Sequence, residues 1–93
     1  MVIGALHVDV HVPAAQSLKD RRAVLRSLKD QLRGRFNIAV AEIEAAEKWQ
    51  RAAVGIAAVG DDRAAVEGAL RQVADWVRAS RLVDVICVEE AYF

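Results

Sequence analysis

Residues 2–12 read VIGALHVDVHV, and this stretch decides the fold. Its even positions carry mainly valine and leucine, whereas its odd positions include both histidines of the chain and an aspartate. A period of two over this length predicts a long β-strand that is covered on one face only. Pro13 follows directly and ends the strand, because proline has no N–H to donate.

A helix is expected next, from about residue 18 to 33. Ser17 followed by Asp20 matches a capping box, in which a hydroxyl and a carboxylate satisfy free backbone amides at the helix start. Apolar residues then recur at helical spacing, and Gly34 is expected to close the helix. This apolar stripe, interrupted by one arginine, comprises Leu18, Arg21, Leu25, Leu28 and Leu32.

The rest of the chain contains two strands, a second helix and a last strand. Residues 36–43 and 51–60 are rich in β-branched and small apolar residues, and the short polar link between them predicts a hairpin. Asp61 and Asp62 open the second helix, where acidic residues match the helix dipole. Residues 82–92 form the last strand. The buried face of the second helix is expected to comprise Val66, Ala69, Leu70, Val73 and Val77.

The resulting order, βαββαβ, predicts a ferredoxin-like α+β sandwich that forms a single domain over residues 1–93. Each crossover should be right-handed, and the middle hairpin forces antiparallel pairing. We therefore expect a four-stranded antiparallel sheet with both helices on one face and the first and third strands at its centre.

Composition excludes several classes of protein. Hydrophobic residues make up 55% of the 93, which excludes a disordered chain. The single cysteine, Cys87, permits no intramolecular disulfide and is expected to pack as a small hydrophobe. No apolar stretch approaches the ~18 residues of a membrane span, and no signal peptide is evident. We expect a cytoplasmic protein with no membrane partner.

A basic stripe follows one side of the first predicted helix. The net charge is zero, yet residues 1–36 carry seven Lys or Arg against three acids, and residues 37–93 carry six against ten. Aligned cations bind phosphates through counterion release, which favours an RNA or ribosomal partner. The alternative is a solvated structural face. The stripe comprises Lys19, Arg22, Arg26, Lys29 and Arg33, and Arg21 and Arg35 are expected to extend it.

Small residues at period two give the predicted sheet a second notable surface. A flat face of this kind suits packing against another sheet at about 10 Å. We expect a second copy of the chain to cover it, most simply as a dimer. In the alternative, the small residues lie beneath the helices and Val54 and Ile56 face outward. The predicted interface residues are Ile3, Ala5, Ala39, Ala41, Ala53, Gly55 and Ala57.

His7, Asp9 and His11 alternate on one side of the first strand and resemble metal ligands. The two histidines would lie roughly 13 Å apart along a strand, too far to bind one ion together. A metal would need adjacent members and a third ligand, such as Glu42 or Glu89. We prefer half-exposed polar residues at a sheet surface, without a metal.

No arrangement typical of catalysis is present. No nucleophile stands beside a base, and Glu89 and Glu90 should point to opposite faces of a strand. The five glycines are scattered, not gathered in a phosphate-binding loop. We therefore expect no catalytic activity and no cofactor. Trp49 is expected to fold over the edge of the core, the alternative being that it stacks on a base, and Trp76 should serve packing.

Three segments resemble the YlxP-like family of small bacterial proteins: SLKDRR at 17–22, RFNIAVAEIE at 35–44 and WQRAAVGIAAVGDDR at 49–63. The resemblance implies a domain of unknown function with a ferredoxin-like fold. It also implies a gene placed, in many bacteria, among genes of transcription elongation and translation initiation, near a ribosome-binding factor. No catalytic residue carries over from the resemblance.

Together these features predict a non-catalytic accessory protein that contacts RNA or ribosomal components through its first helix. The rival interpretation is a homo-oligomeric protein–protein adaptor with no nucleic-acid role. RNase treatment of a pull-down from cell extract distinguishes them, because only the first association needs RNA.

Overall fold

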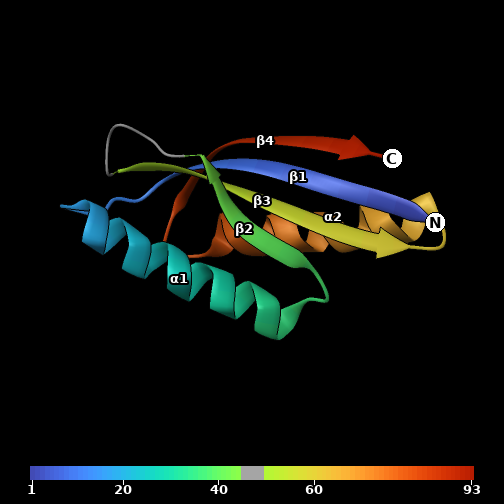
Figure 1. Cartoon of the computed structure of the whole chain (residues 1–93), viewed down its shortest axis with the longest axis horizontal. Helices are drawn as coiled ribbons and strands as arrows, with labels where there is room; N and C mark the ends of the chain where they lie inside the picture. The colour runs from blue at the N-terminus through green and yellow to red at the C-terminus, as the bar shows by residue number, and fades with distance from the viewer. Residues whose placement is uncertain (45–49) are drawn as a thin grey trace.

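In the part of the chain that the structure describes, four strands and two helices follow one another in the predicted order (Figure 1). The computed structural model describes residues 1–44 and 50–93, so the expectation for Trp49 lies outside the described residues. The elements are β1 (Val2–His11), α1 (Leu18–Arg35), β2 (Ala39–Glu44), β3 (Arg51–Gly60), α2 (Arg63–Ala79) and β4 (Asp84–Tyr92).

The strands form one antiparallel sheet in the order β2-β3-β1-β4, with β1 and β3 at the centre as predicted. Val8 of β1 pairs with Val54 of β3 and with Val88 of β4, so these residues share one face of the sheet. Both helices pack on this face, α2 along β1, β3 and β4 and α1 against β2 (Figure 1). The architecture is the ferredoxin-like α+β sandwich that the sequence predicted.

The core lies between this sheet face and the helices. The even positions of β1 from Leu6 to Val10 are fully buried, as their alternation predicted. Gly4 lets α2 approach closely, because a Cβ there would lie 2.6 Å from both Leu70 Cδ1 and Val66 Cγ1. In α2 the prediction for Ala69 was wrong: it is exposed. The buried residues of α2 are Val66, Leu70, Val73, Ala74 and Val77.

Side chains close the start of each helix. The Asp20 N–H donates to Ser17 Oγ at 3.1 Å, and the Asp62 carboxylate accepts from the Ala65 N–H at 2.9 Å. The prediction that Gly34 ends the first helix was wrong, because α1 continues to Arg35. Phe36 then leaves the helix in an extended conformation, so no left-handed residue is needed there. Neither helix is long and apolar enough to span a bilayer, within the described ranges.

Candidate nucleic-acid interface

α1 presents five cations along one flank, here called the basic face: Lys19, Arg22, Arg26, Lys29 and Arg33. Four of them are exposed and Lys29 is half-buried. Since each residue adds about 1.5 Å of rise, the five Cα atoms extend about 21 Å along the helix axis. The predicted stripe is therefore a straight ridge of positive charge.

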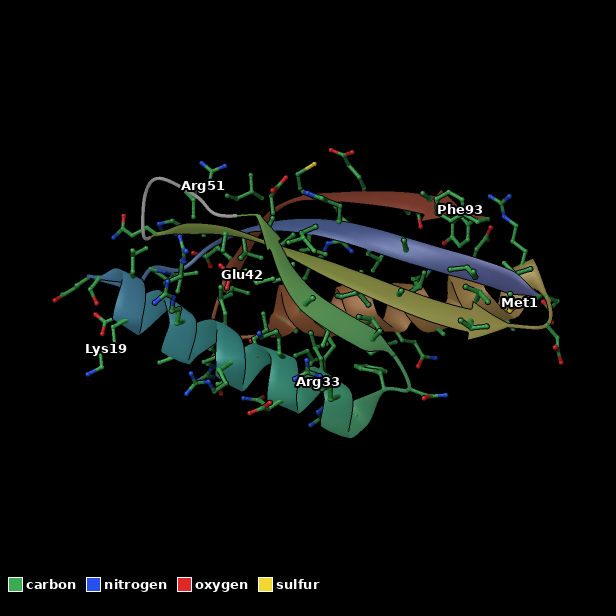
Figure 2. All side chains as sticks on the ribbon, viewed as in Figure 1. Met1, Lys19, Arg33, Glu42, Arg51 and Phe93 are labelled. Atoms are coloured by element: carbon green, nitrogen blue, oxygen red, sulfur yellow. The ribbon has the colours of Figure 1, made fainter. Side chains whose placement is uncertain are left out.

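Arg33 places the basic face beside β2, an edge strand of the sheet. Its Nη2 donates to the carbonyl oxygen of Val40 at 3.0 Å, and its Nη1 lies 3.6 Å from Asp30 Oδ1. Figure 2 shows Lys19 near the start of α1 and Arg33 near its end, next to β2. Arg33 thus anchors one end of the ridge to the sheet.

The other four cations of the basic face make no ion pair with any residue that the structure describes. The two carboxylates of α1, Asp20 and Asp30, interact with groups other than these four cations. Asp20 Oδ2 accepts from the Gln16 N–H at 3.1 Å, and Asp30 pairs with Arg33. The basic face therefore presents net positive charge to solvent.

Arg21 and Arg35 do not extend the basic face, contrary to the prediction. Arg21 lies on the core side of α1, only 4% exposed, and its Nη2 is 3.4 Å from Glu42 Oε1. Its Nη1 also donates to the carbonyl of Arg51 at 3.2 Å. Arg35 lies over the ring of Trp76, with Cζ 5.7 Å from the ring centroid. Both arginines therefore join elements of the fold.

The sheet face away from the helices, here called the open face, has no cover from either helix of the chain (Figure 1). Val54 and Ile56 are buried on the helix side at 2% and 3% exposure, so the alternative orientation of the sheet is wrong. By register, all seven predicted interface residues lie on the open face. One of them, Ala53, is only 2% exposed and offers almost no accessible surface.

A row of alanines crosses the open face from edge to edge. The row comprises Ala39, Ala57, Ala5 and Ala91, each paired with the next on the neighbouring strand. Next to this row, Gly55 makes room for Ile43, because a Cβ on Gly55 would lie 2.7 Å from Ile43 Cγ2. The result is a shallow apolar depression of about 320 Å³. Sequence patterning identified most of this surface but not the complete row.

The polar residues of β1 pair with carboxylates on the same open face. His7 Nδ1 lies 3.8 Å from Asp9 Oδ2, and His11 Nδ1 lies 3.4 Å from Asp84 Oδ2. Glu42, considered as a third metal ligand, is on the opposite face with Arg21. Within the described part of the chain, no three His, Cys, Asp or Glu side chains gather as a metal site.

Cys87 is exposed, so the prediction that it packs as a small hydrophobe was wrong. It pairs with Asp9 of β1 and therefore lies on the open face. A register shift between Asp9 and Val10 leaves Ile86 as an extra residue of β4 beside it. The apolar run around Cys87 signals strand structure, but a strand buries only the face that another layer covers.

A groove of about 270 Å³ between α2 and β4 was not predicted. Arg71 and Arg63 both line this groove. Two contacts fix the position of Arg63: its Nε lies 2.7 Å from Glu67 Oε1, and its Cζ lies 4.6 Å from the centroid of the Tyr92 ring. The hydrogen bond to Glu67 raises the pKa of Arg63 above its usual value. Burial, and then the hydrogen bond to Glu90, raise the pKa of the Tyr92 phenol. Three arginines and two glutamates line the groove.

Nearly the whole chain matches a known sequence family. The profile described as "Protein of unknown function (DUF503)" covers residues 3–90. The chain belongs to this family. It is also similar to the "Uncharacterized protein YlxP" of Bacillus subtilis (strain 168), with 36% identity over 72 residues, or 77% of this chain and 78% of that protein. The YlxP-like resemblance is thus confirmed, and the DUF503 match includes the basic face and most of the open face.

Proposed function

We propose that the protein is a non-catalytic, cytoplasmic accessory protein that contacts RNA, free or within the ribosome, through the basic face. The supporting observation is that Lys19, Arg22, Arg26 and Lys29 form no ion pair among the described residues. Holding such like charges side by side in a free monomer has no stabilising effect. A phosphate backbone supplies the missing negative charge and releases its counterions on binding.

The straightness of the basic face favours a nucleic acid over a compact acidic protein. Its cations recur at regular steps along about 21 Å of helix axis, as phosphates recur along a backbone. Arg22 and Arg26 at its centre can each bind two phosphate oxygens through the planar guanidinium. The proposed contact therefore reads backbone charge and shape.

The composition of the central strands also favours contact with the RNA backbone over stacking on bases. Proteins of related architecture bind single-stranded RNA by stacking bases on sheet aromatics. Here the central strands β1 and β3 contain no Phe, Tyr or Trp. We therefore expect weak discrimination between RNA sequences and a preference for structured RNA.

The test is fluorescence anisotropy with a labelled RNA hairpin, comparing three proteins. The first is wild type and the second carries Arg22→Glu, Arg26→Glu and Lys29→Glu on the basic face. The third, a matched control, carries Arg71→Glu, Arg78→Glu and Arg81→Glu, an equal change in net charge at exposed positions of α2 and the segment after it. The basic-face variant should lose binding at least about 100-fold, whereas the control should lose much less.

Salt dependence provides a second readout. Each phosphate contact contributes about −0.7 to −0.9 to the slope of log K against log salt, so loss of three contacts should flatten the slope by about 2 to 3. Equal binding by the two triple variants would overturn the proposal. A pull-down from extract that persists after RNase treatment, yet is lost in the basic-face variant, would instead support the protein–protein adaptor.

A further inference from the structure

We infer that two copies of the chain pack open face against open face, as a two-fold dimer with the helices on the outside. The first observation is the distribution of exposed apolar side chains. Val59 is 64% exposed and Phe93 is 76% exposed, and both lie on the open face next to Ile3. Ile43 is on the same face above Gly55, and it is 45% exposed. Contiguous apolar surface of this kind is typical of an interface.

The shape of the open face suits another sheet. The row of four alanines forms a shallow depression across all four strands. Larger apolar side chains flank this row along the strand direction, with Val59 on one side and Ile43 on the other. Because the alanines are small and the flanking residues are larger, side chains of a facing sheet can interdigitate with them at an inter-sheet spacing of about 10 Å.

The area is sufficient for a stable dimer. Strands of ten residues extend about 33 Å, and four strands side by side are about 19 Å wide, so each copy contributes about 600 Å². Two copies would bury about 1,200 Å² in total, which reaches the range of specific interfaces. A small ligand would leave most of this surface exposed.

The positions of the charges on the open face are compatible with a second copy. The described residues of the open face that carry a formal charge at pH 7 are Arg51 on β3 and Asp9, Asp84 and Glu89 on β1 and β4. A two-fold axis parallel to the strands, midway between β3 and β1, sets one alanine row over the other. It also places β4 of each copy over β2 of its partner, and β1 over β3. Glu89 then faces Ala41 and Asp9 faces Ala53, so acidic residues of the two copies do not face each other. Arg51 lies over the end of β1, next to Asp84 of β4.

Pairing through the β4 edges is a less favourable way to form a dimer. Glu89 and Glu90 are adjacent and exposed on this edge strand, so a continuous sheet across two β4 strands would bring glutamates of both copies together. The face-to-face dimer avoids this repulsion. The face-to-face dimer also leaves the basic face of each copy at the outer surface. The inference of this dimer does not depend on the proposed binding of RNA.

Sedimentation velocity over about 1–100 µM tests the inference. Wild type should form a dimer, and Ala57→Glu, which puts a charge in the centre of the alanine row, should raise the dimer dissociation constant at least about 100-fold. Ala64→Glu, at an exposed position of α2, is the matched control and should leave it unchanged. Circular dichroism establishes that each variant folds.

Labelling of the native Cys87 tests the dimer without any substitution. This thiol is exposed in the single chain but would be covered by β2 of the partner. Its rate of reaction with a maleimide should fall at least about 10-fold between dilute and concentrated protein. A wild-type monomer at all concentrations, a constant labelling rate, or a folded Ala57→Glu variant that remains dimeric would each overturn the inference.

Discussion

Arg21 Nη2 lies 3.4 Å from Glu42 Oε1, and this pair joins the core side of α1 to the edge strand β2. The Arg21 side chain is 5% exposed and that of Glu42 is 25% exposed, so water screens the pair only weakly. Arg21 also donates to the carbonyl of Arg51 on β3. One arginine thus links three elements of the fold, which explains how an arginine can occupy the apolar stripe of α1.

Removing the carboxylate should destabilise the fold strongly. Glu42→Ala leaves the buried guanidinium without this partner and should lower the free energy of unfolding by about 2–3 kcal/mol, a value reduced for the partial exposure of Glu42. Urea unfolding measures the change. Glu67→Ala, which breaks the exposed pair with Arg63, is the control and should cost less than about 1 kcal/mol.

The double variant Arg21→Met with Glu42→Leu separates charge from packing. An apolar pair of similar volume no longer requires desolvation of charges, so it should recover most of the stability lost in Glu42→Ala. A double variant that is less stable than Glu42→Ala would contradict this expectation. It would show that Arg21 stabilises the fold through its hydrogen bond to the Arg51 carbonyl, beyond the pairing of a buried charge.

Within the basic face, Arg33 and Arg22 should behave differently. Arg33 bonds to Val40 and Asp30, so Arg33→Ala should destabilise the fold by about 1 kcal/mol. Arg22 has no ion pair among the described residues, so Arg22→Ala should change stability by less than about 0.5 kcal/mol while weakening RNA binding. Thermal unfolding together with anisotropy measures both effects. Equal stability losses would contradict the assignment of Arg33 as the anchor.

The fold was predictable because local patterns agree with one another. β1 alternates over its whole length, Ser17 and Asp62 cap the two helices, and each strand carries residues suited to a half-covered sheet. The basic face was also predictable, since helical spacing alone aligns its residues. Whether it binds RNA stays a prediction.

The features that the sequence did not reveal depend on contacts between distant segments. Arg21 appeared to extend the basic face because its acceptor, Glu42, is brought near only by the packing of β2 on α1. Cys87 appeared apolar in context, but whether its strand face is covered depends on which side the helices occupy. Asp84 meets His11 only through the register of β4 with β1. Spacing along the chain carries no information about such pairs.

Gly4 should tolerate no side chain, whereas Gly68 should benefit from one. In Gly4→Ala the new Cβ would meet Leu70 and Val66 of α2 at 2.6 Å, so α2 must shift, at a cost of about 1–3 kcal/mol. Gly68 lies inside α2, and beyond its own helix backbone an added Cβ would meet no neighbouring group within 4 Å, so Gly68→Ala should stabilise by about 0.5–1 kcal/mol. Urea unfolding of both variants measures the contrast. A neutral Gly4→Ala would show that α2 moves away from β1 without loss.

Tyr92 should make the stability of the fold depend on pH in the alkaline range. Burial, and then the hydrogen bond from the Tyr92 hydroxyl to Glu90 Oε2 at 2.9 Å, raise the pKa of the phenol in the folded chain. The folded state thus holds this proton more tightly than the unfolded state, whose pKa is about 10. This contribution to the free energy of unfolding should be fully present below about pH 10. It should be lost as the pH rises through the higher pKa that Tyr92 has in the folded state.

Tyr92 is the single tyrosine, so its phenolate absorbance can be titrated directly in the folded protein. Glu90→Gln should lower the pKa towards its ordinary value, because the acceptor loses its negative charge. Tyr92→Phe should flatten the decline of unfolding free energy above about pH 10, since the group that releases the proton is gone. A phenol that titrates at or below its ordinary pKa in wild type would show that the bond to Glu90 does not form in solution.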